Sequence, residues 1–439
     1  MHKITSVVIA LSLSSAGAQA AEPSALLRYA PSNQAQLIAG ARTHRIELSE
    51  GAAIQAAAKG GFSLATPDGK RVFLRYLGHR VEDNGDLTWR GAVDTALGEQ
   101  TATLTFGSDA VFGTIPTSSG YALRIVSEGD KVYLVEIDEN AVQRSMHVHG
   151  DTPTPIDYVP APSSLRKQKD ASAQSQDRNQ ALVAAAAAAP TVDVFVAYTA
   201  GLRSRLGSAA AMKTRINHVV SVTNQAYADS GVKGRIRLVG TGEVSYPDAV
   251  SLSVALKDLA DSGQGRGPAS LAKIKSWRAD KKADLVSLMM NFHSAQKACG
   301  LAYTLGYDET PITAEDAPYG FGTVADGKLS NGTYCDDRTF AHEIGHNLGL
   351  LHDRDSSTQD ANGDAIPGAT SYAFGWRKNL ANNKSFATIM AYPTGSQRTL
   401  LYFSSPTLKK CNGDPCGVAG KADNVKALNL TMSKVAAFK

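Results

Sequence analysis

The 439-residue chain has little of several features that mark particular protein classes. It has four cysteines, a formal net charge of +4 and 7% aromatic residues. A charge this small does not by itself indicate nucleic-acid binding. Glycine and proline are too few for a collagen-like chain, and 43% hydrophobic residues are too many for a disordered one. A chain of this length can bury sizeable cores without a dense disulfide framework, and two or three domains are expected.

The first 20 residues have the pattern of a secretory signal peptide. Met1-His2-Lys3 is basic, an apolar run extends from about Val7 to Leu13, and Ala18-Gln19-Ala20 is an A-x-A cleavage site. The run is too short to cross ~30 Å of hydrocarbon, and no later segment approaches 18 uncharged apolar residues. We therefore expect a secreted, extracellular protein without a membrane partner, in a compartment where cysteines form disulfides.

The remaining chain divides into three parts by composition. Residues 21–165 are predicted to be β-rich, with strands at 72–77, 101–106, 110–115, 121–125 and 132–137 and a hairpin at Asp83-Asn84-Gly85. Residues 166–190 are polar or alanine-rich and are predicted to be a linker open to proteolysis. Residues 191–439 have a mixed pattern, with strands at 192–198, 235–239, 284–290 and 301–305 and helices at 212–227, 249–261 and 270–282.

The segment with the clearest chemical pattern is H-E-x-x-H-x-x-G-x-x-H, from His342 to His352. His342 and His346 are four residues apart, so both lie on one helical face and can share a metal. On a continuous helix His352 would lie ~15 Å further along the axis, so the helix must end first. Gly349 allows that end, because glycine adopts the left-handed conformation cheaply.

This pattern predicts a catalytic zinc ion held by His342, His346 and His352. Three neutral imidazoles leave an open fourth position, and Glu343 can reach a water there without being a ligand. Chance alone gives H-E-x-x-H in ~0.02 chains of this composition. A purely structural zinc site is the alternative, but it gives Glu343 no task.

The segment resembles the metzincin metalloendopeptidases, which also have a Met-turn after the zinc motif. Thr388-Ile389-Met390-Ala391-Tyr392 matches that turn. The resemblance implies that Met390 lies beneath the zinc histidines. It also implies that Tyr392 contacts the zinc or the oxyanion, with simple packing as the alternative.

Further segments resemble the bacterial peptidyl-Asp metalloendopeptidase (Asp-N endoproteinase) family. These segments span residues 191–198, 224–232, 299–303, 340–352, 388–392 and 402–406. The resemblance covers about residues 191–439. It implies an α+β or α/β protein, in which a β-rich pro-domain precedes a metzincin catalytic domain. That domain is expected to have a twisted mixed sheet with an antiparallel edge strand, packed by helices that include the zinc-binding one.

The four cysteines lie at 299, 335, 411 and 416, and three pairings are possible. Cys411 and Cys416 suggest a small closed turn. That choice leaves Cys299 with Cys335, which would tie the strand at 301–305 to the loop before the zinc helix.

The absence of cysteine before residue 299 excludes a cysteine switch as the way to keep a zymogen inactive. His147 and His149 could reach the zinc, although two strand residues on one face are the simpler interpretation. A pro-region aspartate or steric blockage is at least as plausible. If the enzyme cuts before aspartate, Lys169-Asp170 and Gln176-Asp177 are expected self-processing sites.

The expected reaction is hydrolysis of protein and peptide substrates on the amino side of aspartate. The substrate would lie antiparallel along 301–305, by strand addition. Arg398 is the first candidate for gripping the aspartate carboxylate, because the segment after the Met-turn walls that pocket in metzincins. Arg377 and Lys384 are alternatives.

Other sequence patterns give weaker indications of function. Asp360-Ala361-Asn362-Gly363-Asp364 resembles part of a calcium loop, but it lacks the later bidentate glutamate, so a solvated turn is favoured over a Ca²⁺ site. His218 and His293 are expected on a helix and at a strand end rather than at the metal.

Three functional alternatives to this prediction remain open. They are broader specificity, cell-wall peptides as substrates, and a zinc-holding binding or adhesion protein on a peptidase scaffold. Residues before Pro190 include 17 basic and 19 acidic side chains, and those after it include 28 and 22. The charge of +4 is therefore −2 followed by +6, which is compatible with a pro-region that docks on its own enzyme as inhibitor. We expect a monomer with no nucleic-acid partner.

Overall fold

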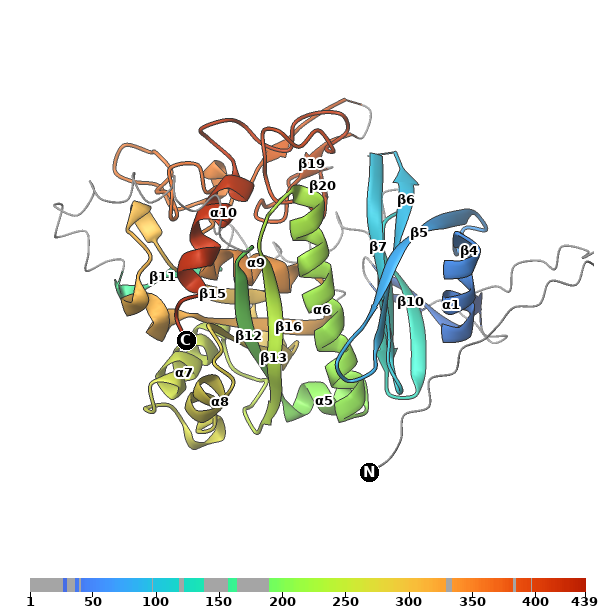
Figure 1. The fold of residues 1–439 in the computed structure, drawn as a ribbon, viewed down its shortest axis with the longest axis horizontal. Coiled ribbons are helices and arrows are strands. Elements are labelled where there is room, and N and C mark those ends of the chain that lie inside the picture. Colours follow the sequence, from blue (N-terminus) through green and yellow to red (C-terminus); the bar gives the residue numbers. More distant parts are fainter. Residues whose placement is uncertain are drawn as a thin grey trace, which may run out of the picture.

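The computed structural model describes residues 27–29, 36–38, 41–96, 98–117, 122–137, 157–163, 189–328, 334–381, 384–395 and 397–439. These residues form two regions, which lie on opposite sides of one long helix, α6 (Figure 1). We call residues 27–137 the N-terminal domain and residues 189–439 the C-terminal domain. Outside the described residues lie the predicted signal peptide, residues 166–188 of the predicted linker, His147 and His149.

The N-terminal domain is an antiparallel sheet with one helix. Its strands pair in the order β1-β3-β10-β9-β8-β7-β6-β5-β4, with β2 beside β3. The elements are β1 (Leu27–Tyr29), β2 (Gln36–Ile38), β3 (Ala41–Leu48), α1 (Glu50–Ala58), β4 (Gly61–Ala65), β5 (Arg71–Val81), β6 (Leu87–Thr95), β7 (Gly98–Phe106), β8 (Val111–Ile115), β9 (Ala122–Glu128) and β10 (Lys131–Ile137). The predicted β-rich region is confirmed, and Gly85 has the positive φ of 90° that its hairpin requires.

The C-terminal domain has a seven-stranded mixed sheet, a small three-stranded sheet and six α-helices among the described residues. Its elements are β12 (Thr191–Thr199), α5 (Ala200–Leu206), α6 (Ala209–Ser230), β13 (Arg235–Val244), α7 (Leu252–Gly263), η3 (Ala269–Leu271), α8 (Ile274–Asp280), β14 (Leu285–Asn291), η4 (Ser294–Gln296), β15 (Gly300–Thr304), η5 (Tyr307–Glu309), η6 (Ala314–Tyr319), β16 (Phe321–Lys328), β17 (Tyr334–Cys335), α9 (Arg338–Asn347), η7 (Arg354–Ser356), β18 (Arg377–Lys378), β19 (Phe386–Ala387), β20 (Arg398–Thr399) and α10 (Asn424–Val435).

The large sheet has the order β11-β15-β16-β14-β12-β13, with β17 beside β16. Strands β12, β13, β14 and β16 pair in parallel, whereas β15 is antiparallel to β16. The predicted mixed sheet with an antiparallel strand is therefore confirmed. Within residues 189–439, β15 is the edge strand, as predicted, and β11 (Tyr158–Pro160) from the predicted pro-region extends the sheet by pairing with it in parallel.

Helix α6 connects the two domains physically. It ends at Gly231, which has a left-handed φ of 87°, as its sequence pattern predicted. Met212, Ile216 and Val219 are buried in the core of the C-terminal domain. Strands β7 and β8 of the N-terminal domain contact the same helix, so it is covered from both sides (Figure 1).

A buried charge network joins the domains at the start of α9. Arg124 of β9 places its Nε 3.2 Å from Asp337 Oδ2, and Arg215 of α6 bonds both Asp337 and Asp326. We call these four residues the docking network. His218 lies beside it, 3.1 Å from the hydroxyls of Thr105 and of Thr114, and burial lowers the pKa of its imidazole.

Candidate metal centre

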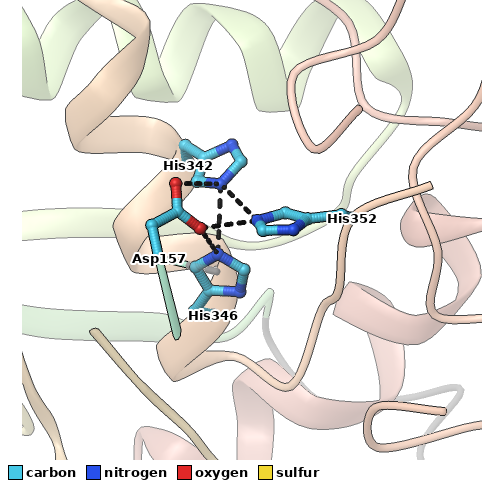
Figure 2. Close-up of side chains that lie close together, drawn as sticks. All are labelled: Asp157, His342, His346 and His352. Carbon is cyan, nitrogen blue, oxygen red and sulfur yellow. Dashed lines mark hydrogen bonds and ion pairs between the residues drawn. The ribbon is translucent and has the colours of Figure 1, made fainter. Parts of the chain in front are cut away.

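Helix α9 presents His342 and His346 to the same side, and the chain then turns sharply. Gly349 makes the turn with a φ of +84°. A Cβ at that position would lie 2.9 Å from the carbonyl oxygen of Leu305, so both the conformation and the space favour glycine. The turn returns His352 to the two helical histidines, as the motif predicted (Figure 2).

The three imidazoles converge through their Nε2 atoms. Nε2 of His342 lies 3.1 Å from that of His346 and 3.2 Å from that of His352. On the far side of the rings, Nδ1 of His342 lies 2.9 Å from the Ile389 carbonyl and Nδ1 of His346 lies 2.8 Å from the Leu350 carbonyl. A carbonyl can only accept, so both Nδ1 atoms carry the proton and both Nε2 lone pairs are free for a metal.

Asp157 completes the cluster from the predicted pro-region. Its Oδ1 lies 2.6 Å from His352 Nε2 and 3.2 Å from His346 Nε2, and its Oδ2 lies 3.4 Å from His342 Nε2 (Figure 2). Burial raises the pKa of the Asp157 carboxyl, but the charges of His352 and His342 outweigh burial and hold that pKa well below its usual value. The carboxylate is therefore ionised and can act as a ligand.

The donor set fits a tetrahedral zinc ion. Four ligand atoms, one from each of the three histidines and one from Asp157, all lie within 4.8 Å of one another. Zinc bonds of ~2.0–2.1 Å in a tetrahedron separate the ligands by about 3.3 Å. The separations of His342 Nε2 from the Nε2 atoms of His346 and His352, 3.1 and 3.2 Å, agree with that value.

Glu343 lies beside this cluster with its carboxylate unsatisfied. The side chain is buried, and neither oxygen has a hydrogen-bond partner within the described residues. Burial, and then the charge of Asp157, raise the pKa of the Glu343 carboxyl well above its usual value. A Cβ at Gly300 of β15 would lie 2.0 Å from Glu343 Oε1, so glycine at 300 makes the room that this carboxylate occupies.

The segment around Met390 supports the helix from below. A Cβ at Gly345 would lie 2.6 Å from Met390 Sδ, so the methionine packs directly against α9. Tyr392 lies with its ring centroid 4.3 Å from that of His352, and its hydroxyl donates to Asp157 Oδ2. The tyrosine therefore faces the metal centre and contacts its fourth ligand.

Asp353 and Arg377 fix that tyrosine. The backbone N–H of Tyr392 donates to Asp353 Oδ2 at 3.1 Å, and its carbonyl accepts from an Arg377 guanidinium nitrogen at 2.8 Å. Arg377 also pairs with Asp353 at 3.1 Å. Because Asp353 directly follows His352, this trio ties the Met390 turn to the third histidine.

The residues after Asp157 anchor it beside the three histidines. The Tyr158 ring packs 5.2 Å from the rings of His346 and His352, and its hydroxyl bonds Thr358 at 3.0 Å. Residues 158–160 then pair in parallel with Ala302, Tyr303 and Thr304. The segment thus covers the strand on which the sequence places a substrate.

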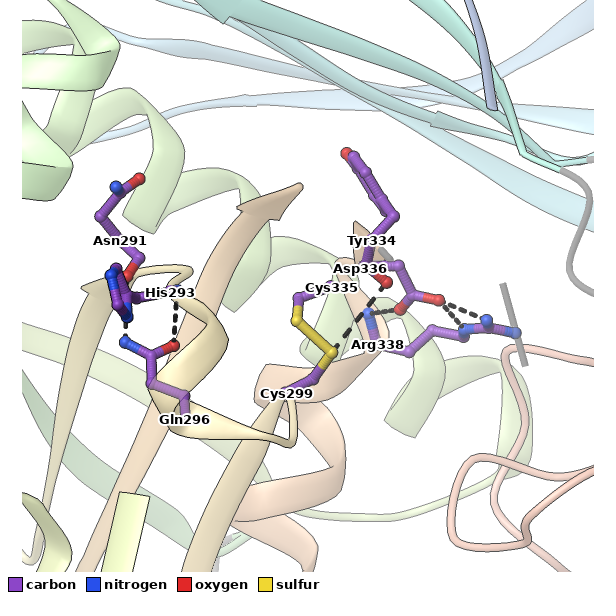
Figure 3. Close-up of a disulfide and its surroundings, with 8 residues drawn as sticks. All are labelled: Asn291, His293, Gln296, Cys299, Tyr334, Cys335, Asp336 and Arg338. Atoms are coloured by element: carbon purple, nitrogen blue, oxygen red, sulfur yellow. Dashed lines mark hydrogen bonds and ion pairs between the residues drawn. A yellow bond between two sulfur atoms is a disulfide. The ribbon is translucent and has the colours of Figure 1, made fainter. Parts of the chain in front are cut away.

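Two disulfides are present, Cys299–Cys335 and Cys411–Cys416. Both are the pairs expected from the sequence. Figure 3 shows the first one joining the start of β15 to the segment that carries Asp336 and Arg338. It therefore links the strand beside the metal centre to the start of α9.

Comparison with known proteins agrees with this geometry. The sequence profile described as metallo-peptidase family M12B, reprolysin-like, matches residues 188–422. The chain belongs to the reprolysin-like M12B family. The match includes the three histidines, Glu343 and the Met390 turn.

Relatives of this M12B chain carry the name peptidyl-Asp metalloendopeptidase. A protein of Pseudomonas aeruginosa is 31% identical over 57% of this chain, and one of Stenotrophomonas maltophilia R551-3 is 31% identical over 52%. These matches span 40% and 48% of the relatives' own lengths. A protein of S. maltophilia K279a is 28% identical over 84% of this chain and 81% of its own length.

The predicted specificity residues of this M12B chain lie in different surroundings. Arg377 is occupied by Asp353, Asp355 and the Tyr392 carbonyl. Lys384 lines a 230 Å³ cavity with Lys409 and Lys410, next to the N-terminal domain.

Arg398 lies on β20 and is half-buried, and within the described ranges its guanidinium has no ion pair or hydrogen bond. The sequence did not single out Arg338, one turn before His342. That guanidinium pairs with Asp336 and donates to the Thr399 carbonyl, beside Arg398. Among these arginines, Arg398 is the one without a carboxylate partner within the described residues, and the Lys384 ammonium also lacks one.

Asp360 forms a local turn. Its Oδ1 accepts the backbone N–H groups of Asn362 and Asp364, each at 2.9 Å. The carboxylate is thus used by its own loop, which accords with a solvated turn. His218 lies on α6 and His293 caps a short 3₁₀ turn after β14, and neither approaches the metal centre.

Asp157 is the site residue that the sequence did not identify by number. An aspartate in the pro-region was among the expectations, and the Asp-Tyr-Val-Pro order was its only local signal: a short strand closed by proline.

No helix within the described residues has both the length and the apolar character needed to cross a membrane.

Proposed function

We propose that this chain is a secreted zinc-dependent endopeptidase, made as a zymogen, that cuts peptide bonds on the amino side of aspartate. The observation that carries the proposal is the pairing of three converged histidines with a buried, unpartnered Glu343. A zinc site with only a structural role needs no such carboxylate. The names of the relatives support the preference for aspartate.

His342, His346 and His352 would hold the zinc. When bound, the ion would polarise the scissile carbonyl and make its water a nucleophile near neutral pH. Glu343 accepts the proton of the attacking water and then delivers it to the leaving amine. Tyr392 donates its hydroxyl to the oxyanion, in place of the hydrogen bond that it gives Asp157 in the proform.

The proform would be inactive because Asp157 takes the fourth ligand position. Residues 158–160 also occupy the strand-pairing edge of β15. They run parallel to β15, whereas a substrate is expected to run antiparallel to it. A segment of opposite direction presents its peptide bonds the wrong way round, so it can fill the cleft without being cut.

Aspartate recognition is assigned to Arg398. A free guanidinium can grip a carboxylate with two hydrogen bonds, whereas Arg377 and Arg338 already spend theirs on other groups. Activation would follow self-cleavage before Asp170 or Asp177, after which residues 157–163 could leave the cleft.

The test is to map cleavage sites in a denatured protein mixture. Processed wild-type protein should cut before aspartate, and chelation or Glu343→Gln should lower the rate by at least ~10³-fold. N-terminal sequencing of the secreted protein identifies the activation cut. If chelator-treated and Glu343→Gln proteins retain the wild-type rate, the chain is not a zinc endopeptidase of this kind.

The aspartate preference has its own control. Arg398→Ala should lower cleavage before aspartate by ~10–100-fold relative to cleavage before alanine, because one charge-assisted bidentate contact is lost. Arg338→Ala is the matched variant, since that arginine lies nearby but is paired. An unchanged preference in Arg398→Ala shows that another cation reads the substrate.

A further inference from the structure

A cavity of 530 Å³ lies between the two domains, at the opposite edge of the large sheet from β11 and β15. Residues 235–241 of β13 form one side of it, and α6 and the 82–84 hairpin tip form the others. Its volume falls in the range of ~300–1,000 Å³ that is typical of ligand pockets. It is separate from the metal centre, because β16, β14 and β12 lie between β15 and β13.

The lining of this cavity is predominantly basic. Its charged residues are Arg80, Lys213, Arg235, Arg237 and Lys281, against Glu82 and Asp83. Arg80 is paired with Glu82 at 3.1 Å, and Arg237 is paired with Asp193 at 2.7 Å.

Three of these cations have no carboxylate partner. The ammonium groups of Lys213 and Lys281 make no hydrogen bond or ion pair within the described ranges, and the Arg235 guanidinium contacts only the Thr191 hydroxyl, at 3.3 Å. Three positive charges thus face one cavity without compensation. The cavity therefore favours an anionic ligand.

The backbone of β13 offers a second kind of contact. This strand ends the sheet, so one side of it has no neighbouring strand among the described residues. The Asn224 side chain satisfies the N–H and the C=O of Ile236 on that side, at 2.9 and 3.0 Å. By the alternation of a strand, the N–H and C=O of Leu238 face the same way, beside the cavity. An extended peptide can use such an edge.

The chain's own hairpin shows that this surface accommodates acidic loops. The loop Glu82-Asp83-Asn84-Gly85-Asp86 reaches it from the N-terminal domain. The Asn217 amide of α6 donates to Asn84 Oδ1 and to Asp86 Oδ2, both at 2.9 Å. The hairpin holds only the rim, and the cavity remains beside it.

The cavity and the open side of β13 together form what we call the groove. We propose that this groove is a second substrate site, which binds an acidic segment of a protein substrate in extended form. The segment pairs with the open side of β13 and places its carboxylates among Lys213, Arg235 and Lys281. The choice of a substrate segment rests on the proposed peptidase function. Binding at this groove would hold an acidic protein near the metal centre and lower the KM for its cleavage without changing kcat.

The test uses the full chain with Glu343→Gln, so that cleavage plays no part. Fluorescence anisotropy measures binding of a labelled peptide of glutamate and glycine, with a glutamine and glycine peptide for comparison. Lys213→Ala/Lys281→Ala should raise the Kd of the acidic peptide at least tenfold, and added salt should do the same. Lys233→Ala/Lys421→Ala is the matched control, since both lysines are exposed and lie outside the cavity, and it should leave the Kd unchanged.

Equal binding of the two peptides, or an unchanged Kd in the Lys213→Ala/Lys281→Ala protein, overturns the groove. A third result would also contradict the proposal: phosphate displaces the acidic peptide at constant ionic strength, and the glutamine peptide binds as well as the acidic one. The cavity would then be a simple anion site. Casein cleavage by the same variants with Glu343 intact separates the two proposals. If the Glu343→Gln protein does not bind the acidic peptide while wild type cleaves casein, only the groove proposal fails. If wild type does not cleave casein while the acidic peptide still binds, only the peptidase proposal fails.

Discussion

The N-terminal part of the chain contacts the C-terminal domain in two unlike places. At the metal centre, one short segment supplies a single carboxylate, from Asp157, to three histidines. Along α6, a broad sheet surface packs on the helix, and Arg124 enters the docking network beside Asp337. The first contact is small and lies at the reacting centre, whereas the second is large and lies away from it.

The difference separates two properties of the proposed zymogen. Residues 157–160 would decide whether the enzyme is active, because they occupy the ligand position and the strand edge. The docking network and the sheet surface would decide how firmly the N-terminal domain stays. A change in one place should therefore leave the other property nearly intact.

The largest effect is expected from Asp157→Ala in the full chain. Truncating one partner of a buried charged contact weakens it by about 2–5 kcal/mol, which is roughly 30-fold to several thousand-fold in affinity. The unprocessed variant should therefore cleave peptides, while the unprocessed wild type does not. Peptidase activity is measured on chains whose intactness is checked by mass.

The control for that experiment is Asp151→Ala, another aspartate of the predicted pro-region. It should leave the proform inactive. If the unprocessed Asp157→Ala protein has no peptidase activity, the steric bulk of the segment, and not the Asp157 carboxylate, blocks the active site.

The Cys299–Cys335 disulfide links the two contact places, since Cys335 directly precedes Asp336 and Asp337 while Cys299 precedes β15. Its sequence separation is 36 residues, against 5 for Cys411–Cys416. Loop-closure entropy then gives about 4 kcal/mol for the long loop and about 2 for the short one. Replacing the long pair by serine should lower the Tm more, as calorimetry measures, and should loosen both contacts. A larger drop from the short pair contradicts this order.

Arg124→Ala tests the docking contact alone. Asp337 keeps Arg215, so we expect a loss of ~1–3 kcal/mol in the affinity between the domains. After a cut within residues 164–188, the N-terminal domain should dissociate about 5- to 150-fold faster. The dissociation rate is measured by surface plasmon resonance with the C-terminal domain immobilised. Arg42→Ala is the matched variant, because that arginine is exposed on β3. The uncut Arg124→Ala protein should stay inactive. Peptidase activity of that uncut protein would show that docking of the N-terminal domain and inhibition by residues 157–160 are not independent.

The smallest effect concerns pH. Burial raises the pKa of Asp337, but the charge of Arg215 and the contact with His218 outweigh it and hold that pKa well below its usual value. Arg124 contributes to that depression from the N-terminal domain, so the docked state gains stability above the undocked pKa of Asp337 and loses it as the pH falls through the docked value. Docking of the cut protein should be constant from about pH 5 to 8 and weaken only below about 4. Weakening between pH 5 and 7 would point instead to His218.

The sequence predicted the metal centre better than the way it is closed. His342, Glu343, His346 and His352 stand at fixed spacings set by helix geometry, so one local motif suffices to place them. Asp157 reaches them from about 190 residues away through a strand pairing that no local pattern records. Strand β16 was also missed, because two glycines and the polar residues Thr323 and Asp326 interrupt its apolar pattern.

Helix α1 was missed within the predicted β-rich region. Its buried face consists of alanines, at 52, 53 and 56, and small side chains give little periodic signal. Arg124 and Arg215 were equally invisible, since a buried cation is recognised only once its distant carboxylates are in place.

The most direct measurement is a crystal structure of the full-length Glu343→Gln protein grown with zinc, with anomalous scattering collected at the zinc edge. We predict one zinc ion bound by His342, His346, His352 and a carboxylate oxygen of Asp157, with residues 158–160 paired to β15. A zinc ion bound by the three histidines and water, with Asp157 elsewhere, would contradict the assignment of Asp157 as the group that keeps the proform inactive.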